Sequence, residues 1–261
     1  MIVVKFGGHA MKDENGSFTK AMAAAKSSGE DLVVVHGGGP QIDRALAIAG
    51  VTSEFLGGFR VTTPEIFAVV ERVLTLEVGP QLERTLGNFG IKAHSFSGRS
   101  LPTLISKRRT SLVDGTPVDL GQVGEVLSVN TGEIMDLIEK NILPVLSPIS
   151  ADIDSGEGLN VNADLAAASV AGALQASVLI IMTDVQGIFQ NWPDKSTLIH
   201  SISASKLASL KSTFSQGMAP KVQGALDAIA QGARAVRVID GTDPDSFLAA
   251  LNGDGGTLVY Q

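Results

Sequence analysis

The chain of 261 residues contains no cysteine, one tryptophan and one tyrosine. Without cysteine it forms neither disulfide bonds nor thiolate metal sites, and this composition is compatible with a reducing cytoplasm. No apolar run reaches the roughly 18 residues that a membrane span needs, so we expect no membrane contact. Met1 leads directly into a strand-like stretch that lacks the basic and apolar parts of a signal peptide, which favours a cytoplasmic protein.

Positive charge is also scarce. The chain has 20 lysines and arginines against 27 aspartates and glutamates, and its formal net charge is -7. This balance argues against nucleic acid as a main partner. If the ligands are anions, an acidic protein must gather its cations locally, so lysines and arginines beside glycine turns are the main candidates for binding them.

Several common motifs are missing. There is no G-x-x-x-x-G-K-S/T, no G-x-G-x-x-G after the first strand, no H-E-x-x-H and no G-x-S-x-G. These absences argue against a P-loop enzyme, a dinucleotide-binding fold, a zinc peptidase and a serine hydrolase. The four histidines are scattered, so we predict no protein metal site.

Buried strands alternate with helices along the chain, and 44% of the residues are hydrophobic. This alternation predicts an α/β fold: a three-layer αβα sandwich with a mostly parallel, open central sheet. Residues 64–88 read as one long helix or a bent pair, kinked or broken at Pro80. Residues 92–130 read as β-rich, and the last strand, residues 256–260, is a candidate partner for residues 2–4.

The most informative stretch is residues 33–42, VVVHGGGPQI. It reads as a buried strand, a glycine turn and a helix that begins near Pro40. The glycine amides and the helix N-terminus would then point at one spot and favour an anion there. The alternative is an ordinary tight turn, although two glycines would suffice for that.

Two lysines are candidate phosphate-binding cations. Lys5 ends an apolar strand just before Gly7 and Gly8, where an unpaired buried ammonium is costly. Lys221 falls in the first turn of a predicted helix, where the helix dipole disfavours a cation. The alternative for each is a lysine that reaches solvent.

A predicted flap at residues 55–63 and a polar run at residues 160–164 supply further candidates. Arg60 in the flap can clamp a carboxylate with two hydrogen bonds, or can simply be an exposed hairpin arginine. Strand alternation places Asn160, Asn162 and Asp164 on one side of the chain. Asp164 can alternatively be an ordinary helix N-cap. Lys5, Gly38, Gly39, Asp164 and Asp184 all fall at or just after carboxyl ends of predicted strands, where open α/β sheets bind ligands.

Six blocks occur together: KFGG (5–8), HGGGPQ (36–41), GFRVT (58–62), NVNAD (160–164), TDVQG (183–187) and GMAPK (217–221). In this order and spacing the chain resembles the amino acid kinase superfamily, and within it the acetylglutamate kinases. The flap arginine and the Asn-x-Asn-Ala-Asp block distinguish it from carbamate kinases, aspartokinases and uridylate kinases.

The resemblance implies transfer of the ATP γ-phosphoryl group to the side-chain carboxylate of N-acetyl-L-glutamate, in arginine biosynthesis, with Mg²⁺ carried by ATP. It implies that residues 1–174 bind the amino-acid substrate and that residues 175–261 bind the nucleotide. The implied catalytic residues are Lys5, Lys221 and Asp164, with Asp164 holding both lysines. The implied substrate ligands are Gly38, Gly39, Arg60 and Asn160. The implied nucleotide-binding residues are Gly7, Gly8, Asp184, Val185, Gln186, Gly187, Ile188, Phe189, Thr213, Phe214, Ser215 and Gly217.

One departure from the family pattern bears on regulation. Arginine-inhibited, hexameric members have an extra N-terminal helix and a C-terminal histidine and glutamate, where this chain has Asp245 and Ala250. The comparison therefore implies a homodimer that arginine does not inhibit. One alternative is a kinase of carrier-linked aminoadipate or glutamate, which would need a basic surface for an acidic carrier; the run 107–109 is the only basic cluster in the sequence, and we expect it to face solvent. The other alternative is a non-catalytic amino-acid sensor.

Overall fold

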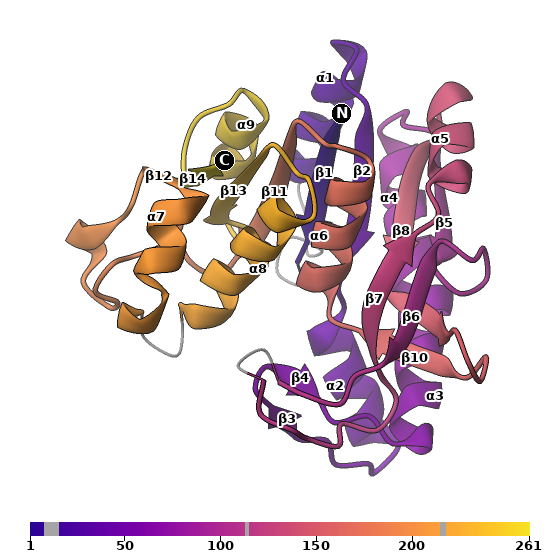
Figure 1. Cartoon of the computed structure of the whole chain (residues 1–261). Helices are drawn as coiled ribbons and strands as arrows, with labels where there is room; N and C mark the ends of the chain where they lie inside the picture. Colours follow the sequence, from indigo (N-terminus) through magenta and orange to yellow (C-terminus); the bar gives the residue numbers. More distant parts are fainter. Residues whose placement is uncertain (8–15, 113–114, 215–217) are drawn as a thin grey trace.

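The computed structural model describes residues 1–7, 16–112, 115–214 and 218–261 (Figure 1). Its central sheet has eight strands in the order β12-β14-β13-β11-β1-β2-β8-β5. The bounds of these strands are β1 Ile2–Phe6, β2 Leu32–His36, β5 Ala93–Ser97, β8 Leu143–Ser147, β11 Val178–Thr183, β12 Ser201–Ser203, β13 Ala235–Asp240 and β14 Thr257–Tyr260. Neighbouring strands are parallel except for β13 and β14, which confirms the predicted sheet.

The last strand pairs differently from our expectation. β14 lies between β12 and β13, and it does not pair with β1. β1 is instead a central strand, flanked by β11 and β2 in parallel register. The candidate pairing of residues 256–260 with residues 2–4 is therefore wrong, and β1 is placed where its carboxyl end meets those of β2 and β11.

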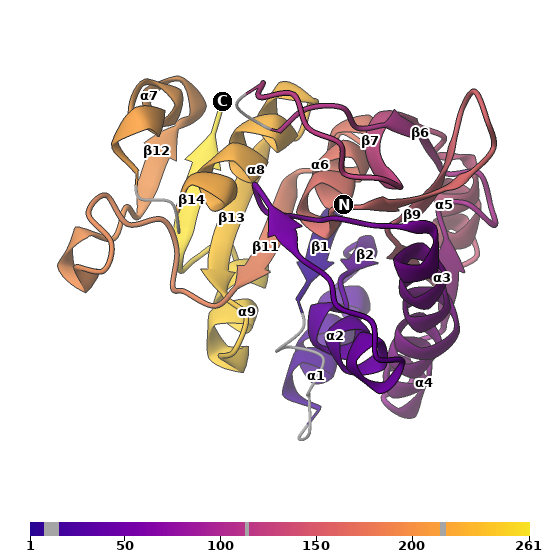
Figure 2. The same cartoon turned by 90° about the horizontal axis from the view of Figure 1, so that it is seen from below.

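Helices cover both faces of the sheet (Figure 2). One face packs against α1 Ser17–Ser27, α4 Gly79–Asn88 and α9 Pro244–Leu251. The other packs against α5 Gly132–Glu139, α6 Ala163–Ala173, α7 Ala204–Ser209 and α8 Ala219–Ala230. Side chains of β1 alternate between the two: Ile2 and Val4 join the first core and Val3 joins the second. The same alternation directs Lys5 toward α6.

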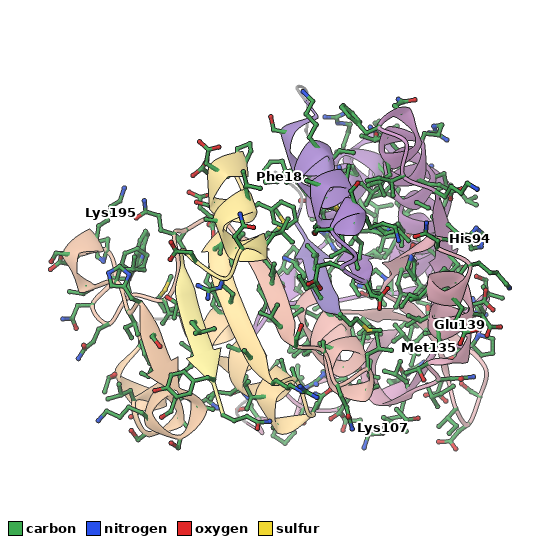
Figure 3. The ribbon with its side chains drawn as sticks, turned by 90° about the horizontal axis from the view of Figure 1, so that it is seen from above. Phe18, His94, Lys107, Met135, Glu139 and Lys195 are labelled. Carbon is green, nitrogen blue, oxygen red and sulfur yellow. The ribbon has the colours of Figure 1, made fainter. Side chains whose placement is uncertain are left out.

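The first core is closed by aromatic contacts between helices of distant sequence. Phe18 of α1 packs against Phe247 of α9, with ring centroids 5.8 Å apart (Figure 3). Phe18 also meets the ring of Phe6 in β1 edge to face, at 6.0 Å. These contacts fix the end of the strand that carries Lys5.

Residues 64–88 form one continuous helical run with an unusual middle. α3 Pro64–Arg72 passes into a π-helical segment, Val73–Val78, and then into α4. Thr63 caps α3 and accepts a hydrogen bond from the Ile66 amide. The run is not broken at Pro80, which lies in the first turn of α4 directly after the π-helical segment. The π-helical segment, a feature frequent at functional sites, was not predicted.

A small closed barrel packs beside the sheet. It contains β6 Leu104–Arg108, β7 Val123–Val129, β9 Ile149–Asp152 and β10 Gly158–Val161. The predicted β-rich stretch supplies two of its strands, and the other two come from the segment after β8. Near it, the predicted flap is a hairpin of β3 Phe55–Leu56 and β4 Phe59–Arg60, turned by Gly57 and Gly58 at φ 55° and 86°.

The remaining elements are α2 Gly39–Ile48 and two 3-10 turns, Lys195–Thr197 and Lys211–Thr213. Within the described part of the chain, no helix has the length and apolar character to cross a membrane.

Candidate active site

The glycine turn joins β2 to α2 as predicted. The Gly37 amide donates to the carbonyl oxygen of Phe6, which ties the turn to the end of β1. A Cβ at Gly38 would lie 2.5 Å from a methyl group of Leu74, so Leu74 packs directly against the backbone of this turn. Gly39 begins α2 with Pro40 in its first turn, so the helix N-terminus is directed at this end of the sheet.

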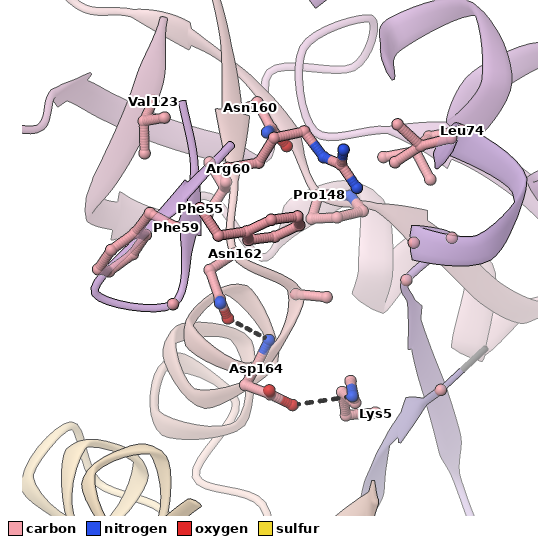
Figure 4. Close-up of a pocket in the computed structure, with 18 of the residues that line it drawn as sticks. Lys5, Phe55, Phe59, Arg60, Leu74, Val123, Pro148, Asn160, Asn162 and Asp164 are labelled. Carbon is pink, nitrogen blue, oxygen red and sulfur yellow. Dashed lines mark hydrogen bonds and ion pairs between the residues drawn. The ribbon is translucent and has the colours of Figure 1, made fainter. Parts of the chain in front are cut away.

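A pocket of about 320 Å³ opens beside this turn (Figure 4). It is lined by six residues that the sequence assigned to catalysis or to acetylglutamate: Lys5, Gly38, Gly39, Arg60, Asn160 and Asp164. They come from β1, the β2–α2 turn, the flap, β10 and α6. The structure therefore brings together segments up to about 160 residues apart in the sequence, at the carboxyl ends of β1 and β2.

Lys5 and Asp164 form an ion pair in this pocket. The Lys5 ammonium lies 3.1 Å from Asp164 Oδ1 and donates to the Met182 carbonyl oxygen at 3.4 Å. Asp164 Oδ1 makes no well-aligned hydrogen bond, so the contact is mainly one of charge. Because only 15% of the Lys5 side chain is exposed, this partner offsets the cost of burying an ammonium.

Asn162, and not Asp164, is the N-cap of α6. Its side-chain oxygen accepts from the amides of Asp164 and Leu165, at 2.9 and 3.2 Å. The reading of Asp164 as an ordinary N-cap is thus wrong, and its carboxylate is left to Lys5. Asn160 is placed differently: its amide donates to the Thr62 hydroxyl at 3.1 Å and joins β10 to the flap.

Lys221 lies at the beginning of α8, and its ammonium is 3.2 Å from Asp184 Oδ1. Asp184 follows β11 directly, two residues after the carbonyl that accepts from Lys5. One turn further along α8, Gly224 faces the Cβ of Asp164, which a Cβ on this glycine would meet at 3.9 Å. Both lysines are therefore anchored around the same end of β1 and β11.

The residues that the resemblance assigns to ATP differ in their exposure to solvent. Val185, Gly187, Ile188, Phe189 and Phe214 are buried, and Ile188 and Phe189 belong to the core on the α6 and α8 side. Because their side chains are buried and apolar, these residues could contact a nucleotide mainly through their backbone N–H and C=O groups. Asp184, Gln186 and Thr213 are exposed, and Gly7 lines the pocket. Gly8, Ser215 and Gly217 lie outside the described residues.

The apolar walls of the pocket were not predicted. They include Phe55, Phe59, Leu74, Val123 and Pro148. Phe55 and Phe59 flank the two glycines of the flap, and this local pattern could have predicted that they lie beside the pocket. Leu74 reaches the pocket from the π-helical segment and Val123 from the barrel, and no local pattern marks either residue.

His36, at the end of β2, is completely buried beneath the glycine turn. Its Nδ1 lies 2.9 Å from the Gly37 carbonyl oxygen and its Nε2 lies 2.9 Å from the Ser147 hydroxyl. Burial lowers the pKa of His36 from 6.5 to about 4, because desolvation disfavours the charged ring. The ring is neutral near pH 7 and acts as a support of the turn.

The described residues contain no cluster of three or more side chains suited to hold a metal ion. The two carboxylates at the site, Asp164 and Asp184, are each paired with a lysine. The charged groups at the site suit contact between lysine ammonium groups and a phosphate. A divalent cation would then be held by the phosphates themselves and not by these two carboxylates.

The basic run Lys107 to Arg109 is largely neutralised. Arg108 donates to Glu157 at 2.7 Å, and Arg109 lies 4.0 Å from Glu125 and over the ring of Phe59. Lys107 lies at the rim of the molecule (Figure 3). The run therefore does not form a strongly basic docking surface.

An open, mostly parallel sheet with a glycine turn, a lysine at the end of β1 and a second lysine at the start of α8 defines an α/β protein of the phosphotransferase type, with cations placed to meet anionic groups. Residues 1–240 match the Amino acid kinase family, and the chain belongs to this family.

Curated relatives and solved structures are consistent with this assignment. The chain is 44% identical to the acetylglutamate kinase of Nocardia farcinica over 263 aligned positions, which cover 99% of this chain and 86% of the relative. It is 42% identical to the acetylglutamate kinase of Mycolicibacterium vanbaalenii, over 100% of this chain and 91% of the relative. A crystal structure of a Streptococcus mutans protein is 28% identical, with a TM-score of 0.81, over 99% of this chain and 98% of that one.

Proposed function

We propose that the protein transfers the γ-phosphoryl group of ATP to the side-chain carboxylate of N-acetyl-L-glutamate, as a step of arginine biosynthesis. The relatives that share more than 40% of its sequence over nearly its whole length carry the name of this activity. The observation that carries the proposal is the single pocket that holds the glycine turn, Arg60, Asn160 and the Lys5–Asp164 pair.

The chemistry suits these residue types. The attacking group is a carboxylate with a reference pKa of about 4.3, so it is ionised near neutral pH and needs no general base. Positioning and charge stabilisation then account for catalysis. In this proposal the Gly38 and Gly39 amides, Arg60 and Asn160 hold acetylglutamate.

The phosphoryl group would meet the two lysines. Lys5 and Lys221 stabilise its charge during transfer. Asp164, the ion-pair partner of Lys5, holds both lysines in place, and Asp184 is a further partner of Lys221. Mg²⁺ would be held by the phosphates of ATP, where it would screen their charge. The nucleotide lies against the segment after β11 and the start of α8, within residues 175–261, and residues 1–174 bind the acid. The enzyme works in the cytoplasm.

A coupled assay of ADP release tests the proposal. Acetylglutamate, glutamate and aminoadipate are compared as acceptors, with a carrier-linked aminoadipate as a fourth. We expect turnover with acetylglutamate and little with free glutamate, which lacks the acetyl group. Turnover with the carrier-linked substrate alone would assign the chain to carrier-dependent kinases, and no turnover with any acceptor would favour a sensor.

We also propose a homodimer that arginine does not inhibit, since Asp245 and Ala250 stand where arginine-sensitive relatives have a histidine and a glutamate. Asp245 lies in the first turn of α9 and Ala250 is buried in the same helix. Activity is expected to be unchanged by arginine at low millimolar concentration, and light scattering is expected to give twice the chain mass. Inhibition at that concentration, or a hexamer mass, would contradict this.

A further inference from the structure

Arg60 is held from three sides by residues that the catalytic assignment does not include. Its Nη2 donates to Asp43 Oδ1 at 2.6 Å, and its Nη1 donates to the Ser53 hydroxyl at 2.6 Å. The guanidinium carbon lies 4.6 Å from the centre of the Phe55 ring. The guanidinium plane is thus fixed by one ion pair, one hydroxyl and one aromatic face.

Burial makes these contacts necessary. Only 5% of the Arg60 side chain is exposed, whereas 59% of the Asp43 side chain is exposed. A guanidinium in such a place is costly unless it has a charge partner and hydrogen-bond acceptors. Asp43 supplies that partner and keeps its own contact with water, so the pair is balanced before any ligand arrives.

The donor inventory leaves room for a ligand. A guanidinium has five N–H groups in a planar fork, and the two bonds named above use two of them. The other three have no protein partner among the described residues. Arg60 lines the pocket and Asp43 does not, so the free donors are available to an acid in the pocket (Figure 4).

Asp43 also connects the two halves of the acid-binding site. It belongs to α2, four residues after Gly39, so it lies on the same side of the helix as the glycine turn. Arg60 belongs to β4 of the flap. The ion pair therefore fixes the spacing between the glycine amides and the guanidinium, the two groups expected to hold opposite ends of a dicarboxylate.

We propose that Asp43 and Ser53 are positioning residues, which aim Arg60 at the α-carboxylate of the acid substrate and set the length of acid that the pocket accepts. The proposal rests on the function proposed above. A carboxylate at position 43 by itself repels an acid ligand. Any favourable effect of Asp43 on substrate binding must therefore come from the way it orients Arg60.

Steady-state kinetics of Asp43→Asn test this role. The substitution keeps the shape and removes the charge, and we expect KM for acetylglutamate to rise about tenfold while kcat and KM for ATP change less than about twofold. Glu54→Gln, an equal change of charge at an exposed residue directly before the flap, is the matched control and is expected to leave all three constants unchanged. Ser53→Ala is expected to raise the same KM about threefold. An unchanged or lowered KM in Asp43→Asn would overturn the proposal.

A double-substitution cycle separates positioning from general loss of structure. If Asp43 acts through Arg60, then Asp43→Asn in an Arg60→Ala background raises KM by less than twofold further. Additive effects in this cycle would show that Asp43 affects the substrate independently of Arg60, and the proposal would be wrong.

A measurement without substrate distinguishes this proposal from the proposed function. In ¹⁵N spectra of the protein alone, the Arg60 guanidinium of the parent chain is expected to show separate Nη signals, because its rotation is restricted. In Asp43→Asn these signals are expected to merge. Merged signals in the parent chain refute the positioning role even if acetylglutamate is the substrate. Separate signals in a protein that fails to phosphorylate acetylglutamate leave Arg60 positioned and refute the substrate assignment alone.

Discussion

Acidification is expected to destabilise the protein through His36. A carbonyl oxygen can only accept, so the ring carries its proton on Nδ1, toward Gly37. In the neutral ring Nε2 is then an acceptor, and the Ser147 hydroxyl donates to it. The same hydroxyl lies 3.2 Å from the carbonyl oxygen of Leu74 in the π-helical segment, but its single proton serves one acceptor at a time. Protonation of His36 would turn Ser147 toward Leu74 and place a charge in the core.

The size of the effect follows from the pKa. Complete burial lowers the pKa of His36 from 6.5 to about 4. The unfolded chain therefore binds a proton that the folded chain excludes, and stability falls as the pH falls from about 6.5 to about 4. Since one pKa unit corresponds to about 1.4 kcal/mol, the loss reaches about 3 kcal/mol near pH 4 and is absent above pH 7.

Urea unfolding at a series of pH values measures this loss. The comparison is between the parent chain and His36→Gln, because other titrating groups cancel in the difference. Asp227, for example, has its pKa raised by burial. Its contribution to the free energy of unfolding therefore decreases as the pH rises, which is the opposite of the effect of His36. Histidine ¹³C signals give the pKa directly if His36→Gln does not fold. A His36 pKa near 6.5, or a stability difference that stays constant between pH 7 and 4, would refute the reasoning.

Two further predictions concern the lysine pair and the packing of α6 on α8. Lys221→Ala is expected to lower kcat about a hundredfold or more, because it removes a charge-stabilising donor; unchanged turnover at saturating substrates would take Lys221 out of the site. Gly172→Ala is expected to lower the free energy of unfolding by about 1–3 kcal/mol, because its Cβ would overlap the carbonyl oxygen of Gln231 and push the two helices apart. Gly87→Ala, in open space on α4, is the control and is expected to be neutral or to add up to about 1 kcal/mol, and equal losses in both variants would contradict the packing argument.

Much of the local structure was predictable because it depends on neighbours in the sequence. The strand at residues 32–36 and the helix that begins at Gly39 follow from a β-branched run, three glycines and a proline. The flap and the cap of α3 follow in the same way from two glycines and from Thr63 followed by Pro64. Each of these signals acts over a few residues, within reach of backbone sterics and short-range hydrogen bonds.

The errors share one cause. β14 was a candidate neighbour of β1, but β13 and β11 lie between the two strands, and strand order depends on long-range packing that no local pattern records. Two polar residues two positions apart, Asn162 and Asp164, each suit a helix cap, but in the structure Asn162 caps α6 and Asp164 pairs with Lys5. In the π-helical segment, the Leu74 carbonyl oxygen lies 3.2 Å from the Ser147 hydroxyl of β8 and the Leu74 side chain packs against Gly38, and no local pattern predicts these contacts.

The sequence by itself therefore determined the strands, the turns, the lysines and the flap arginine, since each is written in local residue type and spacing. Tertiary structure alone decided that Lys5 meets Asp164, that Arg60 meets Asp43 and that apolar residues from the barrel and the π-helical segment wall the pocket. Those contacts join residues far apart in the chain, and side-chain charge and size act between them only after the sheet has brought them within a few ångströms.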